Sequence, residues 1–294
     1  TQGYSSAASD VYKRQIMGNP LVSVVMATFN EPVEYIKASI TSILGQTYSN
    51  LELIIADDST NKETIAAIDH FRMKDNRVII IRDEKRMGFV CALNKGLRLA
   101  KGEYIARMDG DDISDANRFY IQTDYLCSHK EIDILGGSMD IVDHNGKLVS
   151  HRSYPLKGFR LILWTILRNP LGHPTVMFRR KLVDSGFYYD ESFLKAEDLE
   201  FWLRLRKAGF KIANIPQKLL NFRIVGDQAI KRTGDNLRFN YKARVKHLSV
   251  KYFVFDLLSI AIVKLYCVMP RKIISVAYSL ENSSDAQTGE ARAL

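Results

Sequence analysis

Four short apolar runs, each followed by a stretch with helical spacing, constrain the fold of this chain more than any other feature. The runs are rich in Val and Ile and occupy residues 21–27, 51–56, 77–81 and 103–108. Continuous apolar runs of this length are typical of strands that are buried on both faces of a parallel sheet. The alternation of strand and helix therefore predicts an α/β fold with an open, mostly parallel sheet flanked by helices.

Helices are expected between these runs, where apolar residues recur three and four positions apart. They should occupy residues 35–44, 62–71, 88–100 and 115–128. Gly102 is expected to stop the third of these helices, and Asp115 to cap the fourth.

The pattern changes after residue 133. The sequence predicts a hairpin that turns at Asn145-Gly146, followed by a helix at 159–167, a strand at 175–178 and a helix at 197–208 that ends at Gly209. From residue 236 the chain is expected to be helical and basic. Residues 252–269 are mostly apolar, but Asp256 and Lys264 interrupt them. That segment therefore predicts a helix that packs on the protein or lies on a membrane surface rather than one that crosses a membrane.

Cysteine spacing and net charge exclude some classes of protein. The three cysteines are far apart, and no pair has C-x-x-C spacing, so neither a disulfide framework nor a zinc site is expected. The formal net charge is +9, and residues 229–272 contain ten Lys or Arg against two Asp. Such a segment could meet nucleic acid or an anionic membrane, or it could be a solvated helical face.

An acidic cluster, Asp109-Gly110-Asp111-Asp112, follows the fourth run, where ligands of open α/β sheets bind. Three carboxylates this close repel one another, and a divalent cation such as Mg²⁺ or Mn²⁺, which prefers oxygen ligands, would remove the repulsion. Ile113 and Ser114 stand where a calcium-binding EF-hand needs an acid and a glycine. We therefore favour a metal site over a solvated acidic turn that caps the next helix.

Two further acidic pairs leave alternatives open. Asp57-Asp58 follows the second run, where a carboxylate can accept hydrogen bonds from a base or a ribose, but an Asx turn is an equal alternative. Glu197-Asp198 begins a helix, where acids favour the helix dipole; the functional alternative is a general base for a hydroxyl group.

Taken in order, several segments resemble glycosyltransferase family 2, the inverting enzymes of the GT-A fold. The likeness covers about residues 20–225 and depends on the joint order of short motifs, each of which is weak alone. The matching segments are residues 24–31, 42–48, 52–59, Gly88 with 94–96, 100–105, 108–112 and 197–202.

The resemblance implies a role for each matched residue. The nucleotide would be bound by Thr28, Asn30, Glu31, Asp57, Asp58, Asn94 and Asp109. Asp111 would bind the metal directly, and Asp109 would contact the ribose or a metal-bound water. Asp198 matches the catalytic base, with Glu197 beside it. The donor and acceptor pocket would include His173, Trp202 and Arg223.

The resemblance departs from the family pattern at Val225. Many members have a His shortly after an aromatic-Arg pair, and here that pair, Phe222-Arg223, is followed by Ile224 and Val225. A second protein ligand to the metal is therefore in doubt, and the metal, Mn²⁺ or Mg²⁺, is expected to bind well only together with the nucleotide. Arg223 could meet a phosphate, and Asp112 is expected to be a helix-side acid.

The function that the resemblance implies is transfer of a sugar from a nucleotide-sugar, with UDP favoured as carrier, to a hydroxyl of a glycan or lipid-linked glycan. Asp198 would activate that hydroxyl, and the anomeric configuration would invert in a single displacement. The alternatives are an inactive nucleotide-sugar binding protein of the same fold, a nucleotidyltransferase and, on charge alone, a nucleic-acid binder.

The domain organisation is expected to follow the same division. Residues 1–16 are interpreted as a non-native or disordered leader, 17–228 as a GT-A catalytic domain, 229–280 as a basic and apolar helical segment, and 281–294 as a disordered tail. Family members of this size often build lipid-linked polysaccharide, so the helical segment suggests an anionic membrane surface as partner. The expected location is the cytoplasm, peripheral on the inner face of the cytoplasmic membrane.

Overall fold

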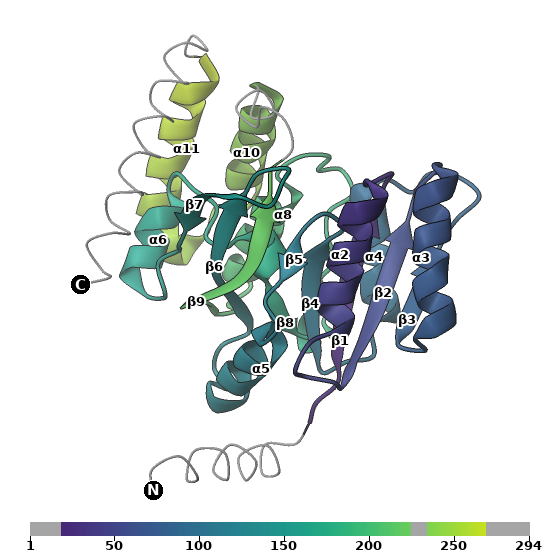
Figure 1. The fold of residues 1–294 in the computed structure, drawn as a ribbon. Coiled ribbons are helices and arrows are strands. Elements are labelled where there is room, and N and C mark those ends of the chain that lie inside the picture. The colour runs from purple at the N-terminus through teal and green to yellow at the C-terminus, as the bar shows by residue number, and fades with distance from the viewer. Residues whose placement is uncertain (1–18, 225–233, 269–294) are drawn as a thin grey trace, which may run out of the picture.

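The computed structural model describes residues 19–224 and 234–268. Its centre is a nine-stranded sheet in which neighbouring strands follow the order β3-β2-β1-β4-β8-β6-β9-β5, with β7 paired to β6 (Figure 1). The strands are β1 (Val22–Thr28), β2 (Leu51–Asp57), β3 (Val78–Ile81), β4 (Tyr104–Asp109), β5 (Ile113–Ser114), β6 (Ile134–Val142), β7 (Leu148–Arg152), β8 (Met177–Arg179) and β9 (Ile212–Arg223).

The first half of the sheet is parallel, as the four apolar runs predict. β1 pairs with β2 on one side and β4 on the other, and β2 pairs with β3. All seven residues of β1 are buried, because both faces of the sheet are covered. In this register Thr28 lies beside Asp57, and Ala27 lies beside Asp109. The carboxyl ends of β1, β2 and β4 therefore meet at one edge.

The second half of the sheet is mixed. β8 runs antiparallel to both β4 and β6, whereas β6 and β9 are parallel. The predicted hairpin is present as β6 and β7, and Gly146 at its turn has φ 81°, which glycine adopts without steric cost. The predicted α/β sheet flanked by helices is confirmed, with its parallel pairing concentrated in β1 to β4.

Helices cover both faces of the sheet. They are α2 (Val33–Leu44), α3 (Lys62–Lys74), α4 (Phe89–Leu99), α5 (Arg118–Ser128), α6 (Phe159–Thr165), α7 (Lys181–Asp184), α8 (Glu197–Lys207), α10 (Gly234–Lys246) and α11 (Phe253–Val268), with short 3-10 turns at His173–Thr175 and Val250–Tyr252. Buried residues of α2, α3 and α5 share one core with alternate residues of β1, such as Val24. Those of α4, α7 and α8 share the other core with Val25.

Three local predictions are wrong. The Asp115 carboxylate accepts a hydrogen bond from Asn117 N, 3.0 Å away, in the turn before α5, so it does not cap the helix. Gly102 does not stop α4, which already ends at Leu99; a Cβ at Gly102 would lie 2.6 Å from the main chain of β1. The strand expected at 175–178 begins only at Met177, because the residues before it form a 3-10 turn.

The C-terminal helical appendage is present as α10 and α11, which pack against each other (Figure 1). α10 also contacts α8, the helix that begins at Glu197. Within residues 19–224 and 234–268, no helix is both long and apolar enough to cross a bilayer. The predicted leader, the tail and Val225 lie outside the described residues.

Candidate active site

A cavity of about 300 Å³ lies at the edge where β1, β2 and β4 end. Its polar walls come from the ends of β1 and β4, the loops that follow β1, β2, β3 and β4, and the end of β9. The polar lining residues are Thr28, Glu31, Asp58, Arg86, Asp109, Asp111 and Arg223. A cleft at the carboxyl ends of parallel strands is the usual ligand site of an open α/β sheet.

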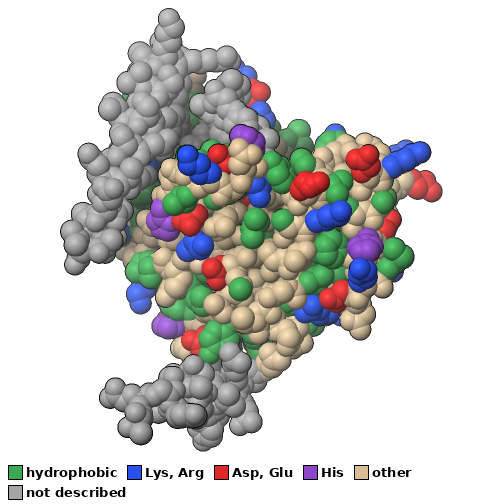
Figure 2. Space-filling view, viewed as in Figure 1, with side chains coloured by type: hydrophobic (Ala, Val, Ile, Leu, Met, Phe, Trp, Pro, Cys, Tyr) green, Lys and Arg blue, Asp and Glu red, His purple; other side chains and the backbone are tan. Residues whose placement is uncertain are grey.

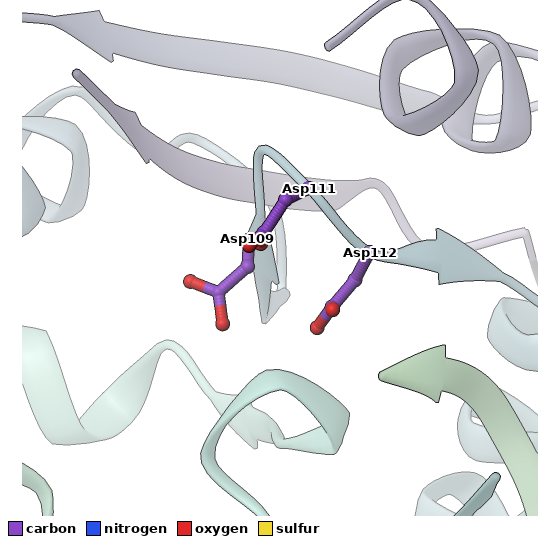
Figure 3. Close-up of side chains that lie close together, drawn as sticks. All are labelled: Asp109, Asp111 and Asp112. Carbon is purple, nitrogen blue, oxygen red and sulfur yellow. The ribbon is translucent and has the colours of Figure 1, made fainter. Parts of the chain in front are cut away.

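Three carboxylates gather at one end of this cavity. One oxygen from each of Asp109, Asp111 and Asp112 lies within 4.8 Å of the others. Figure 3 shows the three side chains leaving the turn between β4 and β5 toward the same side. Gly110 allows this tight turn to pack on the loop after β1, because a Cβ there would lie 3.1 Å from the Thr28 side chain.

Asp112 is more than the helix-side acid that the sequence suggests. It is fully buried, and its Oδ1 accepts a hydrogen bond of 2.9 Å from Arg223 N. Its Oδ2 is buried and has no hydrogen-bond partner among the described residues. Burial, and then the charges of Asp109 and Asp111, raise the pKa of Asp112 well above its usual range.

The donor set of this cluster fits a divalent cation. Burial, followed by the charge of Asp109, raises the pKa of Asp111 to about 6, so the ionised form of Asp111 is disfavoured when no cation is near. Carboxylate oxygens are the ligands that Mg²⁺ and Mn²⁺ prefer, and an orphaned buried oxygen such as Asp112 Oδ2 is expected to have a partner.

The buried side chain of Arg107 interacts with the Asp109 cluster and with the acidic pair Glu197-Asp198. Arg107 is 5% exposed, and two of its guanidinium nitrogens contact the two carboxylate oxygens of Asp109. Its charge lowers the pKa values of Glu197 and Asp198 against the larger, raising effect of their burial. The charge of Arg107 therefore acts both on Asp109, which it contacts, and on the two acids at the start of α8.

Asp198 and Glu197 form the second acidic group. The Asp198 carboxylate accepts hydrogen bonds from Leu199 N, at 2.7 Å, and from the Asn169 amide. Burial raises the pKa of Asp198, and burial together with the charge of Asp198 raises the pKa of Glu197 to about 8. At neutral pH the pair therefore holds a proton that two isolated carboxyls would have lost.

The predicted nucleotide residues fall into two groups. Thr28, Glu31, Asp58 and Asp109 line the cavity. The Asp58 carboxylate accepts hydrogen bonds from the main-chain N–H groups of Met87 and Gly88, at 2.9 and 2.6 Å. These bonds connect the loop after β2 to the start of α4.

Three other residues assigned to the nucleotide are used to hold the protein together. Asp57 is 2% exposed and bonds Thr28 and Arg82. The Asn30 amide accepts hydrogen bonds from Thr60 N and Asn61 N, outside the cavity lining.

Asn94 is 1% exposed, and its amide clamps the main chain of Tyr189 through two hydrogen bonds of 2.9 Å. Asp57, Asn30 and Asn94 therefore hydrogen-bond within the protein and are absent from the described cavity lining, and their nucleotide-binding roles stay predictions.

His173 and Trp202, both expected in the pocket, are absent from the described cavity lining. Burial lowers the pKa of His173 well below its usual range, and its ring hydrogen-bonds Tyr189 Oη at 2.8 Å. Trp202 is 1% exposed and packs its ring 6.0 Å from that of His173. Both residues therefore lie among packed aromatic side chains, and their roles in the donor or acceptor pocket stay predictions.

Arg223 does line the cavity, and its guanidinium joins three segments of the chain. It donates hydrogen bonds to the carbonyls of Asp111, Asp143 and His144, at 3.1 to 3.3 Å, and stacks 4.2 Å from the Tyr35 ring centre. Arg223 thus anchors the acidic turn against the β6–β7 hairpin, and a phosphate contact stays a prediction.

Sequence reasoning missed Phe29 and Arg86 as well as Arg107 and Asp112. Arg86 stacks 3.7 Å from the Phe29 ring centre, and both line the cavity. The position of Phe29, directly after β1, was an available signal, because ligands bind where parallel strands end. Arg86 lies in a charged loop in which no single residue stands out.

Comparison with known sequences gives a consistent result. The family model described as "Glycosyl transferase family 2" matches residues 23–187. An uncharacterized glycosyltransferase of Methanocaldococcus jannaschii is 34% identical over 78% of this chain and 76% of its own length. The amylovoran biosynthesis glycosyltransferase AmsE of Erwinia amylovora is 31% identical over 74% of this chain and 81% of its own.

Two further similarities concern a named reaction and a solved structure. The UDP-Glc:alpha-D-GlcNAc-diphosphoundecaprenol beta-1,3-glucosyltransferase WfgD of Escherichia coli is 31% identical over 65% of this chain and 72% of its own length. The crystal structure of S. aureus TarS 1-349 in complex with UDP-GlcNAc superposes with TM-score 0.65 and 21% identity, covering 82% of this chain and 70% of that one. A longer TarS chain is covered to 40%.

Proposed function

Because this chain belongs to glycosyl transferase family 2, and is therefore a glycosyltransferase, we propose that it moves a sugar from a UDP-sugar to a hydroxyl of a lipid-linked glycan, with inversion. The observation that carries the proposal is the acidic cluster at the cavity: Asp109 and Asp111 line the cavity, and the buried Asp112, which has an unpartnered oxygen among the described residues, belongs to the same cluster. Support for the donor and acceptor classes comes from WfgD, whose name contains both UDP-Glc and a diphosphoundecaprenol acceptor.

In the proposed mechanism Asp111 and Asp112 would hold a divalent cation, and Asp109 would orient the ribose. A cation there would neutralise charge on the departing nucleoside diphosphate. Asp198 takes the proton of the acceptor hydroxyl as its oxygen bonds to the anomeric carbon, while the bond from that carbon to the diphosphate breaks. Attack on the face opposite the leaving group inverts the configuration.

The proposed donor can be tested without knowing the acceptor. UDP added with Mn²⁺ is expected to raise the melting temperature by about 5 °C or more at 100 times its Kd, because a ligand of the native state stabilises it by mass action. UDP without the metal, and Mn²⁺ alone, should give smaller shifts. The measurement is a thermal-shift screen of UDP, dTDP and GDP, and the proposal fails if no nucleoside diphosphate stabilises the protein with either Mn²⁺ or Mg²⁺.

A nucleic-acid partner receives no support from the face of the molecule that Figure 2 shows. Among the coloured residues in Figure 2, basic and acidic side chains are interspersed and form no continuous basic stripe on that face. Binding to nucleic acid depends on many Lys and Arg that contact successive phosphates along one path.

The proposed location is an anionic membrane surface. Support comes from α11, which turns polar residues toward the protein and apolar residues outward. The side of α11 that faces the protein is partly polar: Asp256 pairs with Arg206, and Ser259 donates a hydrogen bond of 2.6 Å to the Ile166 carbonyl. Its outward side carries large apolar residues that are 43–75% exposed, namely Phe253, Val254, Leu257, Leu258, Leu265 and Val268. A helix that buries polar groups and exposes apolar ones is suited to an apolar partner.

The apolar side of α11 continues onto α6. The rings of Phe159 and Phe255 pack 5.8 Å apart, and Phe159, Leu163 and Leu167 are exposed beside them. We call the exposed apolar residues of α6 and α11 the apolar face. The exposed charged residues of these two helices are Arg160 and Lys264, and the exposed Lys157 and Lys251, which lie just before the helices, are also basic. Each basic residue near an anionic surface contributes about 1 kcal/mol to membrane binding.

Substitution on the apolar face tests the membrane proposal without removing α11, whose Asp256 and Ser259 help to hold α8 and α6. The triple variant Phe253→Ser, Val254→Ser, Leu257→Ser should bind phosphatidylglycerol vesicles at least about tenfold more weakly, because each apolar side chain that enters the interface contributes of order 1 kcal/mol. Vesicle sedimentation measures the affinity. Met73→Ser, 78% exposed on α3, is the control and should bind normally; undiminished binding of the triple variant contradicts the proposal.

A further inference from the structure

Arg107 is the buried charge of this site that no expectation from the sequence included. It lies in β4 between Ala106 and Met108, both fully buried, and its side chain is 6% exposed. Residues two apart in a strand point to the same face, so Arg107 and Asp109 are neighbours by backbone geometry alone. An arginine is kept in such an interior only when its charge is paired and hydrogen-bonded.

The pairing of Arg107 differs from that of the other buried arginines. Within residues 19–224 and 234–268, its guanidinium has hydrogen-bond acceptors only on Asp109, one oxygen for each of two nitrogens. The buried Arg118 and Arg223 and the half-buried Arg179 instead donate to main-chain carbonyls and thereby join segments of the chain. Among the described residues, the Arg107 side chain thus donates no hydrogen bond to a main-chain carbonyl, whereas a purely structural arginine does.

The geometry of the pair restricts Asp109. A planar guanidinium that meets both oxygens of a carboxylate fixes the plane of that carboxylate as well as its position, which a lysine ammonium does not do. Phe89, whose ring centre lies 5.6 Å from the guanidinium carbon, covers the cation from another side. Asp109 lines the cavity, whereas Arg107 does not, so the arginine acts on a ligand only through the carboxylate.

We propose that Arg107 is a positioning residue for the nucleotide: its two-pronged contact fixes the Asp109 carboxylate in the cavity wall before the donor binds. The inference depends on the proposed function for the identity of the ligand. It predicts that Arg107 of β4 sets the orientation of the Asp109 carboxylate toward the nucleotide. The affinity for the nucleotide should then depend on this orientation as well as on the negative charge of Asp109.

The test measures UDP affinity by calorimetry with saturating Mn²⁺ in the full-length chain. Arg107→Met is expected to weaken UDP binding by about 10- to 100-fold, the usual cost of losing a residue that orients a ligand-binding group. Arg107→Lys keeps the charge but loses the planar fork, so its affinity should fall between those of Arg107→Met and the wild type. Arg179→Lys, at a half-buried arginine of β8 with main-chain partners, is the control and should bind UDP normally.

A double-mutant cycle separates positioning from a structural role. If Arg107 acts through Asp109, then Arg107→Met should change the UDP affinity of an Asp109→Asn protein by less than about twofold. An equal loss in both backgrounds overturns the inference, and so does wild-type affinity in Arg107→Lys. Should Arg107→Met not fold, Arg107→Lys in the two backgrounds decides the matter. A wild-type protein that binds no nucleoside diphosphate would instead refute the proposed function.

Discussion

Replacing Asp198 by asparagine is expected to lower the rate of sugar transfer by about 10²- to 10⁴-fold, which is the usual contribution of a positioned general base. UDP affinity should stay within about twofold of the wild-type value, because Asp198 is absent from the described cavity lining. Asparagine has the same shape and keeps an oxygen that can accept the hydrogen bond from Leu199 N. Labelled-sugar transfer to a lipid-linked acceptor measures the rate, and calorimetry measures the affinity.

The neighbouring acids provide the controls for this variant. Burial and the charge of Asp198 raise the pKa of Glu197 to about 8, so at pH 7 Glu197 is mainly protonated and cannot accept a proton. Glu197→Gln should therefore lose less activity than Asp198→Asn. Asp190→Asn, which removes a carboxylate paired with Lys246 of α10, should transfer sugar normally. Full turnover by Asp198→Asn would exclude it as the base.

The parallel half of the sheet could be predicted because its signals are local. Each strand from β1 to β4 is a short apolar run, and its neighbours in the sheet follow from the alternation with helices. The second half could not be predicted in the same way. β5 has two residues and β8 three, and their pairing with β9 and β4 depends on contacts between distant parts of the chain. β9 also contains Pro216 and pairs with β6 through register shifts, which hides its length in the sequence.

The candidate site shows the same limit at the level of single residues. Asp58, Asp109 and Asp111 could be predicted to share a cavity because they lie at the carboxyl ends of β2 and β4, two parallel strands of the same sheet. The burial of Asp112 depends on Arg223, which lies 111 residues later in the chain, and no local pattern contains that contact. The contacts of Asn94 could not be predicted for the same reason, since its partners, Tyr189 and Glu191, also come from a distant loop.

Replacing Asp111 by alanine is expected to abolish the metal-dependent part of nucleotide binding. UDP affinity in Mn²⁺ should fall by at least about 100-fold, to the value measured for the wild-type protein with a chelator, because one of the few carboxylates that can hold the cation is lost. Calorimetric titration with UDP, in Mn²⁺ and in chelator, measures both values. Asp184→Ala on α7, which removes an exposed carboxylate paired with Arg180, is the matched control and should leave both affinities unchanged.

The metal-free stability of the Asp111→Ala protein distinguishes loss of the cation from loss of the fold. Burial and the charge of Asp109 raise the pKa of Asp111, which means that the ionised carboxylate is unfavourable in the folded protein without a cation. Its removal should therefore leave the melting temperature in chelator unchanged or raise it, while the stabilisation by UDP with Mn²⁺ disappears. A lower melting temperature in chelator would mean that Asp111 holds the turn itself. Unchanged metal-dependent UDP affinity would mean that the cation is held without Asp111.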